Sequence, residues 1–381
     1  MTTTINNEHK KLNVPNLRFP EFQGEWKRTI FKNVITLQRG SSPRPIIEYV
    51  TTSDDGVNWI KIGDMPHFGR IVTSTEEKIT KEGAKKSRQV NKGDLILSNS
   101  MSYGLPYIMG IDGYIHDGWF VLKNFENTFD KDYLCNLLIS SAIQNQYKRL
   151  AAGGVVQNIS SDLVNSVSVS IPTMMEQKKI SSLLNLIDER IATQNKIIDK
   201  LQSLIKGIAQ KIVRNNKPNV RLYECVECSS STQQESEVCE QGAYPVYGAN
   251  GIVGYLDDYN TEGEAVYIIK DGSGVGTVSY VTGKCSATGT LNTLQAKDGY
   301  SLQYLYYLLK VFNFEPYKTG MAIPHIYFKD YGKAKVFCPS YTEQLQYARL
   351  LSAIDSKLSV EKNTLRNLSL QKQYLLRQMF I

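Results

Sequence analysis

The chain has 381 residues, of which 41% are hydrophobic and 21% are charged, and its formal net charge is +7. This length predicts two or three domains. No apolar run reaches the roughly 18 residues of a membrane-spanning helix, and the polar start from Met1 to Lys11 argues against a secretory signal. Six scattered cysteines suit a reducing compartment. We therefore expect a soluble, cytoplasmic protein with no membrane partner.

The positive charge is concentrated in two stretches. Residues 176–217 contain nine basic and four acidic side chains, and residues 343–381 contain six and three, which leaves −1 for the rest of the chain. Any nucleic-acid contact in the rest of the chain must therefore come from local patches, and the overall charge supports a DNA partner only weakly.

The sequence contains an internal repeat. Residues 171–177 (IPTMMEQ) resemble residues 338–344 (CPSYTEQ) at an offset of 167, which also relates Ile159 to Ile326 and Ile187-Asp188 to Ile354-Asp355. Further upstream, Gly104 corresponds to Gly274 at an offset of 170. We interpret the chain as two copies of one plan, a mixed domain followed by a long helix.

Both predicted helices begin with the same pattern. A proline precedes Thr173 or Ser340, and a glutamate follows each hydroxyl residue after three positions. This spacing predicts a capping box, in which the hydroxyl accepts from a backbone amide and the carboxylate accepts from the cap residue's amide.

Heptads follow each cap and predict a coiled coil. A helix of about 39 residues would be about 58 Å long, so an antiparallel pair would form a rigid spacer. The polar Gln194 and Glu361 either fix the register or lie at a solvent-exposed edge, and the alternative to a spacer is two helices that each fold onto their own domain. Lys372 interrupts the second heptad series. The predicted seam consists of Leu184, Ile187, Ile191, Gln194, Ile198, Leu201, Ile205, Ile208, Leu351, Ile354, Leu358, Glu361, Leu365 and Leu368.

The remaining segments predict two mixed α/β domains with many short strands. Strands are expected at residues 60–62, 94–98, 118–122, 167–171, 265–269, 277–281 and 334–337, and helices at 132–150 and 302–312. The fold class is therefore α/β (α+β), with a pseudo-twofold repeat. The expected segments are a disordered lead (1–14), a first domain (15–172), the first helix (173–217), a second domain (218–339) and the second helix (340–381).

Motifs for catalysis or cofactor binding are weak. The run Gly272-Ser273-Gly274-Val275-Gly276 lacks the lysine of a phosphate-binding loop, so a tight turn beside a strand is the better interpretation. Cys225, Cys228 and Cys239 lack an evident fourth ligand for zinc, and we predict no metal site. We found no methyltransferase, hydrolase or nuclease motif, which favours a binding protein.

Several motifs in order carry a resemblance to a known family. They are Pro-x-Leu-Arg-Phe-Pro-x-Phe at residues 15–22, Trp26-Lys27, Gly-Gly-x-x-Gln-Asn-Ile at 153–159 and Ile-Pro-x-x-x-Glu-Gln-x-x-Ile at 171–180. The chain resembles the specificity subunit of type I restriction–modification systems over nearly its whole length. The second copy departs from the pattern, because residues 321–326 (MAIPHI) replace the Gln-Asn form, and we interpret this as recognition of a different half-site.

The resemblance implies a function in a complex. Each domain would be a target recognition domain that reads one half of a bipartite site in double-stranded DNA, and the helices would set the gap and dock two methyltransferase subunits. Those subunits would use S-adenosylmethionine, and motor–nuclease subunits would use ATP and magnesium. This chain would bind no cofactor and would have no catalytic residues.

Loop positions suggest which side chains contact DNA. Arginine suits guanine, asparagine and glutamine suit adenine, and tyrosine and lysine suit phosphate. Each candidate has the alternative of being an ordinary solvated or turn-forming residue. The candidates are Arg39, Ser41, Arg44, Asn99, Tyr103, Gln157 and Asn158 in the first domain, and Tyr247, Asn250, Lys270, Ser273, Lys318 and His325 in the second.

Two other functions are compatible with the sequence. One is a stand-alone DNA methyltransferase or nuclease with unrecognised motifs, which methyl transfer by the purified chain would reveal. The other is a coiled-coil assembly scaffold that shows no preference for a DNA sequence.

Overall fold

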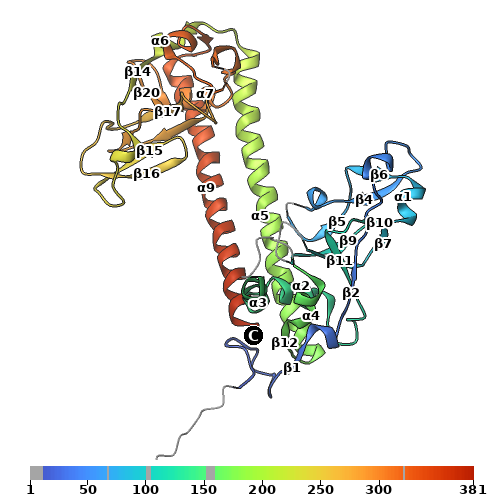
Figure 1. Ribbon diagram of the computed structural model, residues 1–381. Helices are drawn as coiled ribbons and strands as arrows, with labels where there is room; N and C mark the ends of the chain where they lie inside the picture. Colours follow the sequence, from blue (N-terminus) through green and yellow to red (C-terminus); the bar gives the residue numbers. More distant parts are fainter. Residues whose placement is uncertain (1–11, 67, 100–103, 152–158, 321) are drawn as a thin grey trace, which may run out of the picture. The chain divides into compact units, whose positions relative to one another are not determined.

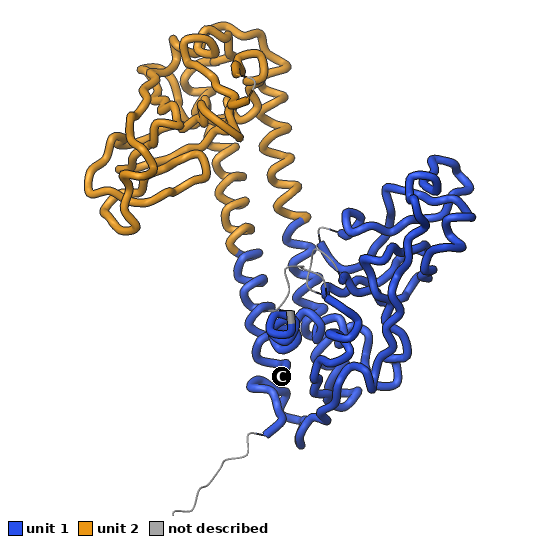
Figure 2. The backbone as a smooth tube through the Cα atoms, in the orientation of Figure 1, with its two compact units in different colours: residues 1–195, 364–381 blue, residues 196–363 orange. Residues whose placement is uncertain are grey.

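The computed structural model describes residues 12–66, 68–99, 104–151, 159–320 and 322–381. They form two compact units, residues 1–195 with 364–381 (unit 1) and residues 196–363 (unit 2). Figure 2 colours the units, and the colour changes partway along each of the two long helices. Each unit therefore combines one mixed domain with part of both helices.

The described residues of unit 1 form three small sheets, with strand orders β1-β12, β3-β6-β4-β10-β7 and β2-β11-β8-β9-β5. Its strands, labelled in part in Figure 1, are β1 (Lys27–Ile30), β2 (Thr36–Arg39), β3 (Val50–Thr51), β4 (Val57–Ile60), β5 (Ile71–Val72), β6 (Glu77–Ile79), β7 (Arg88–Val90), β8 (Leu95–Ser98), β9 (Pro106–Met109), β10 (Gly113–Ile115), β11 (Trp119–Lys123) and β12 (Ser168–Ile171). Its shorter helices are α1 (Lys81–Lys85), α2 (Lys131–Ile139), α3 (Ser141–Ala151) and α4 (Ser161–Ser166), with 3-10 turns at Phe31–Asn33, Ile46–Glu48 and Ile62–Asp64.

Unit 2 also contains three sheets, with strand orders β13-β21, β14-β20-β17-β18 and β16-β15-β19. Its strands are β13 (Val220–Arg221), β14 (Val226–Ser230), β15 (Tyr244–Gly248), β16 (Gly251–Leu256), β17 (Ala265–Ile269), β18 (Val278–Val281), β19 (Ser286–Ala287), β20 (Leu291–Ala296) and β21 (Lys335–Val336). Its shorter helices are α6 (Leu222–Cys225), α7 (Leu302–Leu309) and α8 (Phe328–Tyr331), with 3-10 turns at Glu235–Glu237 and Glu315–Tyr317.

The two domains share one strand plan. The order β2-β11-β8-β9 in unit 1 matches β14-β20-β17-β18 in unit 2, and all of these neighbours pair antiparallel. In the second sheet, β4 and β15 each have an antiparallel neighbour on one side and a parallel neighbour on the other. The repeat in the sequence is therefore a repeat of topology.

The central strands of unit 1 are apolar on both faces because both faces are covered. Leu95 and Leu97 of β8 belong to the core that also contains side chains of the long helices, whereas Ile96 belongs to a second core with Trp119 and Val121. Alternate residues of a strand point to opposite faces, so one continuous apolar run supplies both cores.

The long helices are α5 (Met174–Asn215, 42 residues) and α9 (Tyr341–Gln378, 38 residues). They correspond to about 63 and 57 Å at 1.5 Å per residue. In unit 1 the start of α5 packs with the end of α9, since Leu184 and Met379 share a core. Unit 2 contains the opposite ends of both helices, so the pair runs antiparallel. Neither helix belongs to one domain alone, which excludes two helices that each fold onto their own domain.

None of the predicted seam residues is exposed. Leu184, Ile187, Gln194, Ile198, Ile205, Leu351 and Leu358 are buried, and the other seven are half-buried. Within the helices, Leu186 and Val360, which lie outside the predicted seam, are about 60% exposed. Glu361 is paired with Lys357 of the preceding turn at 3.1 Å, and its side chain is 17% exposed.

Lys372, which interrupts the heptads, has a specific partner. Its ammonium group lies 2.5 Å from a carboxylate oxygen of Asp188 on α5, and Arg70 of the mixed domain donates to the other oxygen at 2.9 Å. Asp188 therefore joins α5, α9 and the first mixed domain. The equivalent Asp355 in unit 2 instead accepts from the Tyr307 hydroxyl at 3.4 Å.

Two equivalent glutamines attach the long helices to their mixed domains. Gln177 Oε1 accepts from the backbone N–H of Asp130, and Gln344 Oε1 accepts from that of Ser301, both at 2.9 Å. Asp130 and Ser301 are the N-caps of α2 and α7. Both glutamines are 1% exposed, so each amide makes these hydrogen bonds from a buried position.

The predicted capping box is complete only in the second copy. Ser340 and Glu343 exchange both hydrogen bonds, at 3.4 and 3.2 Å. In the first copy, Thr173 accepts from the Glu176 N–H at 3.3 Å, but the Glu176 carboxylate binds Arg18 and the Trp26 ring N–H. The prediction was wrong for this carboxylate, because the N-terminal segment covers the helix start and supplies stronger donors.

Two further expectations need correction. The helix expected at residues 132–150 is two helices, because Ser140 adopts an extended conformation, caps the end of α2 and accepts from the Gln144 N–H at the start of α3. The disordered lead was expected to reach residue 14, but Asn13 is ordered, because it exchanges two hydrogen bonds with Trp26. Residues 1–11 lie outside the described part. No described helix has the length and apolarity to cross a membrane.

The Arg18–Glu176 pair provides a stability test. Arg18→Ala would leave the Glu176 side chain, which is 1% exposed, without its guanidinium partner, and loss of one partner of a buried pair costs about 3–5 kcal/mol. We expect a clear drop in the melting temperature of the full chain in thermal unfolding.

The matched control is Glu343→Ala, which removes the equivalent carboxylate on α9. That side chain is exposed and only closes the capping box, so we expect a loss of about 1 kcal/mol. Equal losses in the two variants would contradict a structural role for the buried pair.

Candidate nucleic-acid interface

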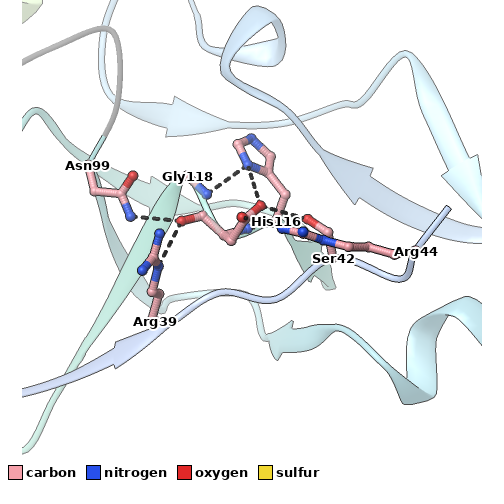
Figure 3. Close-up of polar contacts among 7 residues, drawn as sticks. Arg39, Ser42, Arg44, Asn99, His116 and Gly118 are labelled. Carbon is pink, nitrogen blue, oxygen red and sulfur yellow. Dashed lines mark hydrogen bonds and ion pairs between the residues drawn. The ribbon is translucent and has the colours of Figure 1, made fainter. Parts of the chain in front are cut away.

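A turn at residues 116–118 brings together three of the predicted loop residues of unit 1, Arg39, Arg44 and Asn99, at Asp117 (Figure 3). The Ser42 hydroxyl donates to the Asp117 carboxylate at 2.8 Å, and Arg44 approaches its other oxygen at 3.4 Å. The Asp117 carbonyl oxygen accepts from the Asn99 amide at 2.8 Å and from Arg39 Nε at 3.2 Å. Three predicted residues therefore converge on one residue that the sequence analysis did not select.

The loop at residues 39–44 approaches this turn closely because Gly40 has no side chain. Gly40 N–H donates to the Trp119 carbonyl oxygen at 2.9 Å, and Ser41 N–H donates to that of Ile115 at 3.3 Å. A Cβ atom at residue 40 would lie 1.9 Å from the His116 carbonyl oxygen. Any other residue would push the arginine loop away from the turn.

The arginines of this cluster present their charge to solvent, whereas Asn99 does not. The Arg44 side chain is 82% exposed, and Arg39 and Arg88 are also exposed. Arg88, which the sequence analysis missed, donates from Nε to the Arg39 carbonyl oxygen at 3.1 Å. Asn99 is 4% exposed and supports the turn from inside. Exposed guanidinium groups on a fixed frame suit contacts with phosphate or with guanine.

Titratable groups in the turn support one another. The Ser42 hydroxyl, with a smaller contribution from Arg44, lowers the pKa of the Asp117 carboxyl below its ordinary value. Burial lowers the pKa of His116, and the Asp117 charge opposes this effect. The Gly118 N–H donates to His116 Nδ1 at 2.8 Å, so this nitrogen carries no proton. The folded turn therefore holds a neutral imidazole.

In unit 2, residues 270–272 lie beside the segment around His325. His325 Nδ1 lies 2.7 Å from Asp271 Oδ1. The Lys318 ammonium pairs with Glu315 at 2.5 Å, and Ser273 is exposed in the glycine run. That run forms a turn between β17 and β18, with the Gly276 N–H bonded to the Ile269 carbonyl at 2.9 Å. The interpretation of the glycine run as a tight turn is therefore confirmed.

The two clusters occupy equivalent places in the repeat. The Ile159 N–H donates to the Asn99 carbonyl oxygen at 2.8 Å, and the Ile326 N–H donates to that of Lys270 at 2.9 Å. Asn99 and Lys270 each follow a buried strand and donate to the residue before the neighbouring strand, Gly118 O and Thr290 O respectively. The predicted residues in both units therefore lie at the same end of the same kind of sheet.

The remaining candidates fall into two groups. Tyr247 and Asn250 lie in the β15–β16 hairpin, where Tyr247 is half-buried against Tyr267 at a ring distance of 5.7 Å and Asn250 is exposed. Tyr103, Gln157 and Asn158 lie outside the described residues. Asp117 and Asp271 gave only a weak signal in the sequence, because a carboxylate repels phosphate and, among base edges, suits mainly the amino group of cytosine.

The cysteines considered for zinc lie in different surroundings. Cys225 is buried with its Sγ atom 3.8 Å from that of Cys338, whereas Cys239 is exposed. In the described part of the chain, no group of three or more His, Cys, Asp or Glu side chains could hold a metal ion.

Comparison with protein families gives a match over most of the chain. Residues 24–203 and 219–369 each match the type I restriction modification DNA specificity domain. The chain is 20% identical over 350 residues to the EcoprrI specificity subunit of Escherichia coli, covering 85% of this chain and 86% of that protein. It is 25% identical over 261 residues to a putative type I specificity subunit of Mycoplasma genitalium, covering 62% and 68%.

Solved structures share the fold. The S subunit of a type I restriction–modification system from M. genitalium superposes with a TM-score of 0.63 at 18% identity, covering 97% of this chain and 99% of that one. A chain from a study of complex assembly in the type I restriction–modification system gives a TM-score of 0.55 at 16% identity, covering 92% and 96%.

The turn at His116 predicts a pH dependence of stability. Because the pKa of His116 is lower in the folded chain than in the unfolded chain, the unfolded chain binds a proton first as the pH falls. Stability from the neutral ring is complete above about pH 6.5, the ordinary histidine value, and decreases below it.

His116→Asn tests this, because the asparagine oxygen can accept from the Gly118 N–H in an Asx turn and does not titrate. We expect the melting temperature of the wild-type chain to fall more than that of the variant between pH 7.5 and 5. Parallel pH curves would contradict the proposed role of this ring.

Proposed function

The chain belongs to the family of type I restriction–modification DNA specificity domains, and we propose that it selects a bipartite DNA sequence for a complex whose catalytic centres lie in other subunits. In this proposal each mixed domain reads one half-site through its loop cluster. The observation that carries the proposal is the equivalent pair of backbone hydrogen bonds, Ile159 to Asn99 and Ile326 to Lys270, which supports two similar loop clusters with different side chains.

The chemistry of the two clusters favours two different half-sites. Unit 1 presents three exposed arginines around Asp117, whereas unit 2 presents lysines and the His325–Asp271 pair. Guanidinium and ammonium groups both suit the acceptor atoms of guanine, whereas a neutral imidazole offers one donor and one acceptor. Joining two readers in one chain makes the second contact effectively intramolecular, so both half-sites contribute to affinity.

The proposal extends to partners and cofactors. Two methyltransferase subunits would dock on the helix pair and bind S-adenosylmethionine, and motor–nuclease subunits would bind ATP and magnesium. The helix pair supports a docking role because α5 and α9 expose apolar side chains outside their seam, such as Leu186, Leu204 and Leu370. This chain would bind none of these cofactors.

The proposal is tested by mapping methylated adenines in DNA from cells that express this chain with its methyltransferase partner. We expect methylation only where two fixed half-sites occur at one spacing. Methyl transfer by the purified chain alone would indicate a stand-alone enzyme, and methylation without sequence preference would indicate a scaffold.

The helix pair predicts how the spacing of the half-sites can be changed. Inserting one heptad into α5 after Asn195 and another into α9 after Asn363 lengthens both helices by about 10 Å at 1.5 Å per residue. The seam register is preserved. Because base pairs are about 3.4 Å apart, we expect the methylated sites to keep both half-sites and to gain about three base pairs between them.

A control places a seven-residue Gly/Ser insertion between the exposed Glu240 and Gln241 of unit 2. This loop lies outside the helices, so the gap should stay as in the wild-type chain. A helix insertion that changed the half-sites and left the gap unaltered would contradict the role of the helices as a spacer.

A further inference from the structure

The His325–Asp271 pair combines exposure with a rigid frame. The ring nitrogen Nδ1 and the carboxylate oxygen Oδ1 are 2.7 Å apart, and each side chain is 35% exposed. An exposed polar pair loses side-chain entropy when it becomes ordered. A well-aligned pair that is partly exposed to solvent therefore needs support from the backbone.

Three chain segments provide that support. His325 exchanges two backbone hydrogen bonds with Thr319, at 2.8 and 2.9 Å. Gly272 follows Asp271 in the chain, and its N–H donates to the carbonyl of Pro324, the residue before His325, at 3.0 Å. With the Ile326 bond to Lys270, every residue next to the pair is fixed, so the imidazole is presented from a defined position.

The place of His325 in the repeat connects it to sequence selection. His325 directly precedes Ile326, and Asn158 directly precedes the equivalent Ile159, so the offset of 167 relates the two side chains. The backbone bond of the following isoleucine is the same in both units. The repeat therefore keeps this backbone bond, and the second copy of the sequence has an imidazole where the first has an amide.

The carboxylate determines which ring nitrogen carries a proton. An ionised carboxylate only accepts hydrogen bonds, so the nitrogen that faces it, Nδ1, must donate. In the neutral ring the other nitrogen, Nε2, then has a free lone pair. In the major groove, the donors that such an acceptor can bind are the exocyclic amino groups of adenine and cytosine.

We propose that His325 reads an exocyclic amino group of adenine or cytosine in the half-site of unit 2, and that Asp271 is the positioning residue that orients the ring. This inference rests on the proposed function and identifies one of its base contacts. It accounts for an acidic residue in a cluster that would contact DNA, since the carboxylate is directed at the ring.

The test maps methylated sites for variants reconstituted with the methyltransferase partner. For His325→Ala we expect a loss of roughly ten-fold in the preference for the amino-bearing base at one position of the unit 2 half-site. The unit 1 half-site should stay unchanged. Asp271→Ala should relax the same position although His325 is retained, and Asp271→Asn, which keeps an acceptor oxygen, should restore most of the preference.

The control is Ile323→Ala, which alters an exposed apolar side chain of the same segment and should leave every position as in the wild type. A purely structural role of Asp271 would lower methylation at all sites without changing the preference at one position, and would overturn the inference. Full discrimination in His325→Ala would also overturn it while the proposed function stands. A wild-type chain that selects no bipartite site would instead overturn the proposed function, and this inference with it.

Discussion

The attachment of each long helix to its mixed domain depends on a buried amide. Gln177 and Gln344 accept from the N-cap residues of α2 and α7 at 2.9 Å, and each also donates to the proline carbonyl before its own helix. A glutamine side chain can donate and accept at once. It therefore links the starts of two helices, because it pairs with the N-cap N–H of one and with the proline carbonyl before the other. This geometry is the same in both units and sets where each mixed domain begins relative to its helix.

The copies differ where the chain ends meet the helices. In unit 1 the N-terminal segment covers the start of α5, and its Arg18 takes the Glu176 carboxylate that would otherwise close a capping box. Asp188 is held there by Arg70 and Lys372, whereas Asp355 in unit 2 has a tyrosine partner. Equivalent positions thus keep their residue type but change partner, because in unit 1 the N-terminal segment supplies Arg18 and α9 supplies Lys372.

The candidate interface depends on acidic residues that do not themselves suit DNA contacts. Asp117 orients the loop that carries Arg39 and Arg44, and Asp271 lies against His325. Arginine and asparagine are common base-contacting residue types, whereas a carboxylate suits mainly cytosine. Asn99 has the residue type of a base contact, but its amide donates to the Asp117 carbonyl in the interior. Loop position alone cannot distinguish a side chain that faces DNA from one that supports the loop.

Sequence alone predicts the duplicated plan, the two long helices and the α/β character of the domains, because these follow from the internal repeat, local periodicity and cap chemistry. These patterns can be read from the linear sequence: the offset between Gln177 and Gln344, the glycine turn at residues 272–276 and the heptads. The folded chain was needed to show that Lys372 pairs with Asp188, that Glu176 binds Arg18 and that the candidate loops meet at Asp117 and Asp271. These contacts join residues between 54 and 184 positions apart, so the folded backbone, and no pattern within a window of sequence, brings the charges together.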